Sequence, residues 1–279
     1  MKKAGIAGYP VDHSLSPVIH NAAYRDMGED IEYGFYPTPL EQLDDLIGGL
    51  DDTWAGLSLT MPLKQAVIDK LDFVDGLAKT VGAVNTVCYQ PSGGQVVGFN
   101  TDVYGIAQAV RESGEISTPS AIILGARATA SSALAACVEL GIKQHITLAA
   151  RNHGGFGSAV AAASRMDLSP SLVKLTDNIE SSLAGTGLLV STLPGGVADD
   201  LADRITDANL NLSGLTVLDV NYHPWPSKLV AATEARGATI VPGWAMLLHQ
   251  AVSQVRLFTN RTPDVGVMRA ALEAELARR

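Results

Sequence analysis

The sequence predicts an α/β protein with two lobes, of which the second is a doubly wound parallel sheet. Short apolar runs alternate with helical patterns along most of its 279 residues, as they do in βα units. Hydrophobic residues make up 47% of the chain and charged residues 18%, a balance typical of a globular protein. The length is sufficient for two lobes, and no apolar run is long enough for a membrane span.

The first lobe is expected to begin with a strand at 2–9. Ser16 and Pro17 predict the start of the next helix, since a serine side chain can cap a helix and proline fits its first turn. Gly28 can end this helix, because glycine readily adopts the left-handed conformation at a helix end. Further strands are expected at 31–36, 54–60, 85–90 and 95–99, with a helix at 39–50 and a hairpin-like turn at 91–94.

A second series of strands and helices begins after about Asp102. Its expected strands are 121–125, 145–150, 186–192, 215–220 and 238–242, with helices between them that include 129–141 and 153–166. This regular alternation favours a parallel sheet with helical crossovers. The tail 243–279 is helical by pattern. We therefore expect one domain of residues 1–103 plus 243–279 and a second of residues 104–242.

Composition argues against several classes of partner. The net charge is −9 and the isoelectric point about 5.1, without a cluster of Lys or Arg, so we expect neither nucleic acid nor a membrane surface as partner. Cys88 and Cys137 lack metal-site spacing and are expected to be buried, reduced thiols. Asp12 interrupts the N-terminal apolar stretch, so we expect no signal peptide and a cytoplasmic protein.

Two serines and one lysine are candidates for chemistry. Ser14 and Ser16 lie at a helix start, where hydroxyls can donate to a carboxylate, although a turn residue and a cap are the simpler interpretation. Thr60 and Pro62 predict a helix that puts Lys64 in its first turn. The helix dipole disfavours the charged form of such a lysine, which suits proton transfer. A solvated surface lysine explains the same stretch equally well.

Polar residues also gather where two apolar strands end. One cluster is Asn85 and Thr86, and the other is Asn100, Thr101 and Asp102. Ligands bind at strand ends in open α/β sheets. Asn and Asp are also common turn formers, but two such clusters soon after Lys64 favour a binding site.

Six segments occur in the order, and near the spacing, found in one enzyme family: SLSP, SLTMPLK, GAVNTV, NTD, DVNYHPWPSKL and GWAMLLHQAV. From about Gly5 to Phe258 the chain resembles the shikimate dehydrogenases. The resemblance implies an N-terminal substrate domain, a Rossmann-like nucleotide domain and an NADP-linked enzyme that interconverts 3-dehydroshikimate and shikimate. Ser58 and Ser227 replace the family's usual Asn and Thr, and both keep a hydrogen-bonding side chain.

The resemblance also implies a role for each candidate residue. Lys64 and Asp102 form the catalytic pair, since hydride delivery to a ketone creates an alkoxide that needs a proton. The substrate carboxylate binds Ser14 and Ser16, the ring hydroxyls bind Thr60, Asn85 and Gln250, and Tyr222 closes the pocket. No His/Cys cluster suggests a metal site.

The stretch ILGARATASSAL, residues 122–133, resembles a dinucleotide-binding turn, G-x-G-x-x-G/A, with Arg127 at its second glycine position. A Cβ there crowds the pyrophosphate and makes a positive φ costly if the turn requires one. Because a guanidinium can pair with phosphate, either Arg127 holds the cofactor in a rearranged turn or the affinity is lowered. The expected cofactor-binding residues are Gly125, Ala126, Arg127, Ala128, Thr129, Arg151, Asn152, Thr192, Gly243 and Met246.

Arg151 is the residue that favours NADP over NAD as the expected cofactor. It follows the next strand, at the place where an acidic residue would bind the ribose hydroxyls of NAD, and its charge suits the additional phosphate of NADP. Near the C-terminus, Gly243, Met246 and Gln250 share one helix face, although Met246 can equally be plain core.

Two alternatives remain open. One is a quinate/shikimate dehydrogenase that uses NAD, against which Arg151 and Ser16 both argue. The other is a paralogue that binds a shikimate-like ligand with an impaired cofactor site, which Arg127 motivates and the intact pair of Lys64 and Asp102 opposes. We expect a monomer or a homodimer.

Overall fold

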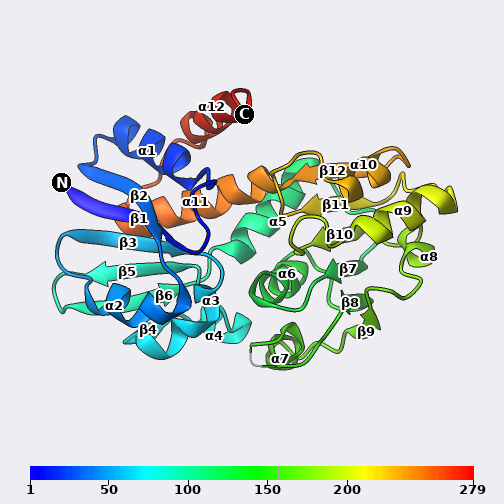
Figure 1. Ribbon diagram of the computed structural model, residues 1–279, viewed down its shortest axis with the longest axis horizontal. Helices are drawn as coiled ribbons and strands as arrows, with labels where there is room; N and C mark the ends of the chain where they lie inside the picture. The colour runs from blue at the N-terminus through cyan, green and yellow to red at the C-terminus, as the bar shows by residue number, and fades with distance from the viewer. Residues whose placement is uncertain (156) are drawn as a thin grey trace. The chain divides into compact units, whose positions relative to one another are not determined.

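The computed structural model describes residues 1–155 and 157–279, which fold into two compact units (Figure 1). Unit 1 comprises Met1–Thr101 and Leu247–Arg279, and unit 2 comprises Asp102–Met246. The expected domain boundaries, after residues 103 and 242, lie close to these divisions. The expected helix 153–166 includes Phe156, which lies outside the described residues.

Unit 1 is built on a mixed six-stranded sheet of order β2-β1-β3-β5-β6-β4. Only β5 runs antiparallel to its neighbours, because a tight hairpin joins it to β6, as expected for residues 91–94. The elements are β1 Lys2–Gly8, α1 Ser16–Met27, β2 Ile31–Pro37, η1 Leu40–Gln42, α2 Leu43–Gly48, β3 Trp54–Leu59, α3 Leu63–Ala66, η2 Ile68–Lys70, β4 Phe73–Val74, α4 Gly76–Val81, β5 Thr86–Gln90, β6 Gln95–Phe99, the larger part of α11 Gly243–Thr259, and α12 Val265–Leu276.

Strand β3 lies between two helical layers of unit 1. Its Leu57 and Leu59 face one side, where they join the core formed with α2, α3 and α4. Because side chains alternate along a strand, Gly56 and Ser58 face the other side, which α11 covers. The absence of a side chain at Gly56 lets the ring of Phe258 approach the strand.

The ends of α1 differ in part from expectation. Gly28 ends the helix with a positive φ of 66°, as predicted. The predicted cap at Ser16 is wrong: Leu15 occupies the N-cap position, and no side-chain cap bond forms. The side chain of Ser16 is buried instead, and its backbone N–H donates to Ser14 Oγ at 3.2 Å.

Unit 2 is a parallel six-stranded sheet of order β12-β11-β10-β7-β8-β9, the doubly wound arrangement of Rossmann-like domains. The predicted parallel sheet is therefore confirmed. Its elements are α5 Asp102–Ser113, β7 Ala121–Leu124, α6 Ala128–Glu139, β8 Ile146–Ala150, α7 Ala159–Arg165, β9 Ser171–Lys174, α8 Glu180–Leu183, β10 Leu188–Ser191, α9 Asp199–Ala208, β11 Thr216–Asp219, α10 Lys228–Glu234 and β12 Thr239–Pro242.

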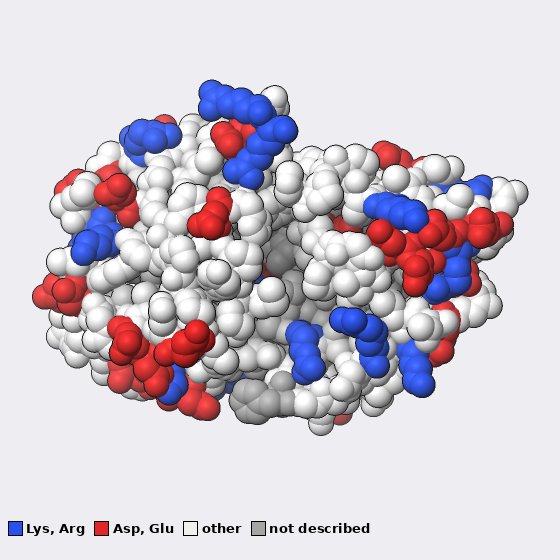
Figure 2. Space-filling model, in the orientation of Figure 1, with Lys and Arg blue, Asp and Glu red and all other residues white. Residues whose placement is uncertain are grey.

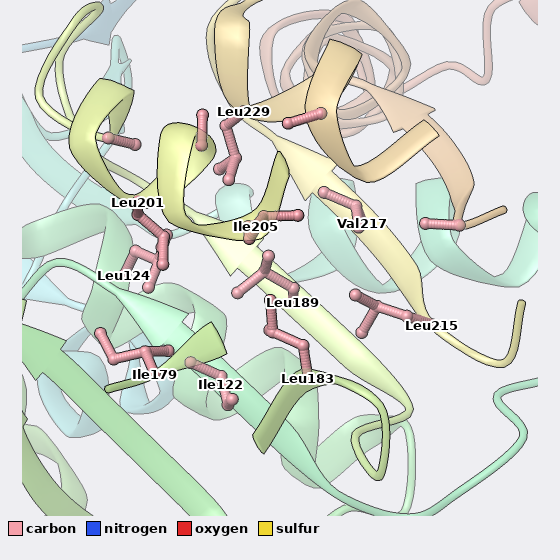
Figure 3. Close-up of a cluster of buried hydrophobic side chains, with 14 of the residues drawn as sticks. Ile122, Leu124, Ile179, Leu183, Leu189, Leu201, Ile205, Leu215, Val217 and Leu229 are labelled. Carbon is pink, nitrogen blue, oxygen red and sulfur yellow. The ribbon is translucent and has the colours of Figure 1, made fainter. Parts of the chain in front are cut away.

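One face of this sheet carries a large apolar core. Side chains of β7, β10 and β11, among them Leu124, Leu189 and Val217, pack against α8, α9 and α10 (Figure 3). Helices α5 and α6 pack on each other, and they contact β12 and β7 respectively. Burial on both faces explains why these strands read as continuous apolar runs rather than as alternating ones.

Two short strands and one helix end escaped prediction. The strands β4 and β9 lie at sheet edges and are largely exposed, so neither has an apolar signature. The helix expected over 153–166 begins only at Ala159, where Ser158 caps it. Gly155 and Gly157 precede it with positive φ values of 102° and 65°, which a helix does not accommodate. No helix within residues 1–155 and 157–279 has both the length and the hydropathy needed to cross a membrane.

The substitution Gly56→Ala is expected to destabilise the protein by about 1–3 kcal/mol, because over-packing forces side chains and backbone apart. An added Cβ would lie 2.2 Å from the Phe258 ring and 2.5 Å from the Val87 carbonyl oxygen. Urea unfolding would measure the loss. Gly48→Ala is the control, since open space surrounds that position at the end of α2. Equal free energies of unfolding for the two variants would contradict the close approach.

Candidate active site

Four connections of the unit 1 sheet, three after strands and one before a strand, lie at the same end of the sheet. The carboxyl ends of β1, β3 and β6 meet the amino end of β5 there, because β5 runs antiparallel to β3 and β6. The Thr60 N–H donates to the Ala7 carbonyl at 2.9 Å, and the Leu59 N–H donates to the Asn85 carbonyl at 2.7 Å. The candidate residues of unit 1 therefore lie in the connections at this end of the sheet.

Lys64 is the second residue of the short helix α3. The helix begins after Pro62, so the predicted placement of Lys64 in a first turn is confirmed. The buried side chain of Leu63 anchors α3 in the core below it. The Lys64 carbonyl accepts a hydrogen bond from the Val84 N–H at 2.7 Å, which ties the helix to the segment that enters β5.

Asn85 is the centre of a buried polar cluster. Its Oδ1 accepts from the backbone N–H of Thr101 at 2.7 Å and from Thr86 Oγ1 at 2.9 Å. Its Nδ2 donates to Thr101 Oγ1 at 2.9 Å and to Gln250 Oε1 at 3.4 Å. The Thr101 N–H can face only an oxygen, so the orientation of the Asn85 amide is determined. The structure thus brings the candidates Asn85 and Gln250 together, with Asp102 directly after Thr101 in the chain.

The two candidate serines lie together at the start of α1. Ser14 Oγ donates to Ser16 Oγ at 3.2 Å, and both side chains are buried. Both hydroxyls can turn toward an anion, because neither is committed to capping the helix.

Three buried polar residues that pack next to these candidates were not predicted from the sequence: His20, Tyr33 and Gln254. The His20 ring stacks on Tyr33 with 4.1 Å between centroids, and its Nε2 bonds Gln254 Oε1 at 3.2 Å. Two signals were available in the sequence. Gln250 and Gln254 are four apart on one helix, as are His20 and Tyr24, so each pair shares a face that otherwise packs in the core.

The cofactor candidates of unit 2 also share one edge. They follow the carboxyl ends of β7, β8, β10 and β12, which coincide because the strands are parallel. Gly125 has a φ of 120°, and a Cβ there would lie 2.2 Å from Thr192 Oγ1. Thr192 donates to the Leu124 carbonyl at 2.8 Å, so glycine lets the β7 and β10 ends approach each other.

Arg127 adopts an ordinary backbone conformation in the turn between β7 and α6. Its φ of −115° and ψ of −162° are extended, so this turn does not require a positive φ at the second glycine position. Its guanidinium Nη1 donates to the Gly154 carbonyl at 3.3 Å, in the loop that begins with Arg151 and Asn152. Asn152 Oδ1 accepts from the Gly154 N–H at 2.8 Å and so shapes the same loop.

The remaining candidates lie at the other strand ends of unit 2. Gly243 begins α11, where a Cβ would lie 2.6 Å from the Asp219 carbonyl oxygen. Met246 is buried, and Tyr222 is half-buried in the loop after β11. Among the described residues, no group of three His, Cys, Asp or Glu side chains is placed to hold a metal ion.

Comparison with known proteins identifies the family. The profile of the shikimate dehydrogenase substrate binding domain matches residues 6–87, and that of the shikimate 5′-dehydrogenase C-terminal domain matches residues 243–273. The shikimate dehydrogenase (NADP(+)) of Methanothermobacter thermautotrophicus is 34% identical over 276 residues, which cover 98% of this chain and 96% of that relative. The chain belongs to the shikimate dehydrogenase family.

Solved structures of shikimate dehydrogenases share the fold. The enzyme of Mycobacterium tuberculosis is 33% identical, with a TM-score of 0.83 over 99% of this chain and all of that one (100%). The shikimate 5-dehydrogenase of Thermus thermophilus, solved in complex with NADP(H) and shikimate, is 29% identical, with a TM-score of 0.82 over 98% of this chain and 99% of that one. The expected two-domain α/β fold is therefore confirmed.

The two departures from the usual shikimate dehydrogenase pattern keep hydrogen bonds. Ser58 Oγ accepts from the Tyr33 hydroxyl at 2.6 Å and donates to Gln254 Oε1 at 2.7 Å. Ser227 caps α10, where its Oγ accepts from the Val230 N–H at 3.2 Å and donates to Asp219 Oδ2 at 2.6 Å. Both serines therefore have structural partners within their own unit.

His20 is expected to make the protein less stable as the pH falls below about 6.5. Burial lowers the pKa of His20 to about 3, and the hydrogen bond with Gln254 offsets only part of this effect. Between pH 6.5 and pH 3 the unfolded chain binds a proton that the folded chain does not. The free energy of unfolding therefore falls with pH through this window, by up to about 1.4 kcal/mol per pH unit.

Urea unfolding at pH 8 and pH 5 measures this contribution. The wild-type protein should lose about 2 kcal/mol more between the two pH values than His20→Phe, whose residue 20 does not titrate. The comparison uses the change with pH, so the lower absolute stability of the variant does not enter it. Equal changes in the two proteins would show that His20 does not remain neutral.

Proposed function

We propose that this protein is an NADP-dependent shikimate dehydrogenase that reduces 3-dehydroshikimate to shikimate and catalyses the reverse reaction. The observation that carries the proposal is the buried cluster of Asn85, Thr101 and Gln250 at the end of β6, directly before Asp102. A relative at 34% identity is named for this NADP-dependent activity, and a structural neighbour was solved with NADP(H) and shikimate. Oxidation of NADPH in the presence of 3-dehydroshikimate, followed by absorbance, tests the proposal.

Unit 1 supplies groups for each part of the substrate. Ser14 and Ser16 bind the carboxylate, helped by the positive end of α1. Thr60, Asn85 and Gln250 bind the ring hydroxyls, to which amides and hydroxyls can both donate and accept. The family resemblance also assigns Tyr222 a role in substrate binding. The buried, mutually bonded cluster supports these roles, because its side chains are held in one orientation before a substrate arrives.

Lys64 and Asp102 handle the proton. The ammonium of Lys64 donates a proton to the carbonyl oxygen as it becomes an alkoxide, and it recovers the proton in the reverse direction. Asp102 holds this ammonium in place and accepts a hydrogen bond from the substrate. The Val84–Lys64 backbone bond and the Asn85–Thr101 bond support this pairing, since they connect the chain segments that carry the two residues.

The residues of unit 2 fit an anionic dinucleotide. Gly125 lets the ends of β7 and β10, which both carry cofactor candidates, approach each other closely, and the first turn of α6 contains no acidic residue. Arg127 and Arg151 bring two positive charges to the two loops at this edge. Residues 125–129 would hold the pyrophosphate, Arg151 and Asn152 the 2′-phosphate, and Thr192, Gly243 and Met246 the nicotinamide. The cofactor would supply the hydride as NADPH when the ketone is reduced and would accept it as NADP+ in the reverse direction.

The two alternatives lead to different measurements. An NAD-using quinate/shikimate dehydrogenase would turn over faster with NAD, although the loop after β8 presents Arg151 where an acidic residue would be expected. A paralogue with an impaired cofactor site would show no enhancement of nicotinamide fluorescence on titration with NADPH. The extended backbone at Arg127 argues against the second alternative, since the turn forms without strain.

The partner and compartment assignments rest on composition. Acidic and basic side chains adjoin one another in several groups on the face shown in Figure 2, and the net charge of the chain is −9. The protein is expected to act on its small-molecule substrate as a monomer or homodimer in the cytoplasm. The two buried cysteines, both free thiols, fit a reducing compartment.

Lys64→Ala is expected to lower kcat by at least about 100-fold, the usual contribution of a positioned proton donor. The fold should be retained, since the backbone carbonyl that accepts from Val84 remains in the alanine variant. Steady-state kinetics and circular dichroism would measure the two effects. Lys70→Ala is the matched control, because Lys70 forms an exposed ion pair with Asp44. A near-normal kcat for Lys64→Ala would remove Lys64 from the mechanism.

Arg151→Ala is expected to weaken binding of 2′,5′-ADP about ten-fold or more, as the loss of a charge-assisted hydrogen bond would, and to weaken binding of ADP, which lacks the 2′-phosphate, less. Arg127→Gly is expected to weaken binding of ADP to a similar degree, because its diphosphate stands for the pyrophosphate. Calorimetry measures both ligands without turnover, and Arg111→Ala, at the end of α5 in the same unit, is the control. Tighter binding of ADP by Arg127→Gly would show that the arginine crowds the site.

A further inference from the structure

Gln254 occupies an unusual position for a polar side chain. It lies on α11, one helical turn after Gln250, and is completely buried with 0% of its surface exposed. A buried amide is costly unless its donors and acceptors are satisfied. Gln254 meets this requirement fully: its Oε1 accepts two hydrogen bonds, and its Nε2 donates two.

The backbone carbonyl of Asn85 determines which way the Gln254 amide points. Gln254 Nε2 lies 3.2 Å from this oxygen and 2.9 Å from Thr86 Oγ1. In the flipped amide, Oε1 would face the Asn85 carbonyl, and two acceptors would repel each other. Gln254 Oε1 therefore points the other way, toward Ser58 and His20.

This orientation determines the protons on the β2 side. Gln254 Oε1 can only accept, so Ser58 Oγ donates to it, and Ser58 must in turn accept from the Tyr33 hydroxyl. The protons of Ser58 and Tyr33 are therefore both directed along this chain toward Gln254.

The same orientation determines the protons on the β5 side. Thr86 Oγ1 accepts from Gln254 Nε2, so its own proton goes to Asn85 Oδ1 at 2.9 Å. Together with the Thr101 N–H, this bond fills the oxygen of the Asn85 amide. The Thr101 N–H directs Asn85 Nδ2 toward Thr101 Oγ1 and Gln250, and the bond from Thr86 holds the amide in that orientation. Asn85 Nδ2 is the group that we assign to a ring hydroxyl.

We propose that Gln254 is a positioning residue that, through Thr86, holds the Asn85 amide in its substrate-binding orientation. The proposal rests on the proposed function, because Asn85 is assigned to the hydroxyl subsite. Gln254 does not touch Asn85 Nδ2, and it acts through the Thr86 hydroxyl and the Asn85 carbonyl. An apolar side chain of the same size would fill the same space, so packing alone does not account for a glutamine here.

Gln254→Met removes all four hydrogen bonds while it keeps the length of the side chain. We expect the KM for shikimate to rise about ten-fold or more, because one or two buried bonds are each worth roughly 1 kcal/mol. The KM for NADP should stay within about two-fold, since no cofactor residue depends on Gln254. Steady-state kinetics with each substrate varied in turn measures both constants, and thermal unfolding measures the loss of stability.

Tyr24→Phe is the matched control. It removes a buried hydroxyl that bonds His20 Nδ1 at 3.2 Å, at the end of the network remote from Asn85 and the serines. This variant should lose stability to a similar degree while keeping the wild-type KM for shikimate. A wild-type KM in Gln254→Met, or the same increase in Tyr24→Phe, would show that Gln254 only stabilises the fold.

Gln254→Glu provides a second test that does not depend on the stability of the methionine variant. The ionised carboxylate of this variant has no donor for Thr86 or the Asn85 carbonyl, whereas the protonated acid regains one. Burial raises the pKa of a carboxyl group. The KM for shikimate, divided by the wild-type value at each pH, should therefore fall between pH 8 and pH 6. A ratio independent of pH would overturn the proposal, whereas a wild-type protein without shikimate turnover would overturn the proposed function instead.

Discussion

The hydrogen bond from the Thr101 backbone to Asn85 Oδ1 is the contact on which the arrangement of unit 1 depends. It joins the entry of β5 to the exit of β6, and the antiparallel pairing of these strands brings the two ends together. A buried backbone N–H without a partner is costly, so the Asn85 side chain has one acceptable orientation. The Asn85 Nδ2 group then points to Gln250, and Asn85 Oδ1 also accepts a hydrogen bond from the Thr86 hydroxyl. One backbone group therefore determines the direction of the hydrogen bonds around it.

Unit 1 places this polar network on one face of its sheet and an apolar core on the other. Leu57 and Leu59 alternate with Gly56 and Ser58 along β3, so a single strand contributes to both. The network contains no ion pair, and burial keeps His20 neutral by lowering its pKa to about 3. Neutral groups with complementary donors and acceptors avoid the desolvation cost of a buried charge. The charged candidates, Lys64 and Asp102, lie instead in the loops and helix starts that leave this edge.

The sequence predicted what depends on local pattern and failed where distant residues meet. Buried strands such as β3 and β10 carry apolar runs, and the residues directly after them are the candidates Thr60 and Thr192. The edge strands β4 and β9 have no such runs. Ser16 satisfies every local rule for a cap, but its side chain is buried beside Ser14 instead. His20 and Gln254 are separated by 234 positions, and no local spacing reveals their contact.

Arg127 shows what the second glycine of a dinucleotide-binding turn contributes. Its φ of −115° lies in the range of any residue, so the turn does not need glycine for its conformation here. What glycine adds is the absence of a Cβ, which allows a phosphate to approach the backbone closely. With arginine, the Cβ hinders this close approach. The side chain instead provides a guanidinium, which is directed at the loop of Arg151 and Asn152. Neutral backbone donors contact a phosphate only at short range, whereas a guanidinium also attracts it over several ångströms. The binding energy of the cofactor in this chain is therefore expected to depend more on charge, and on salt concentration, than in a relative with both glycines.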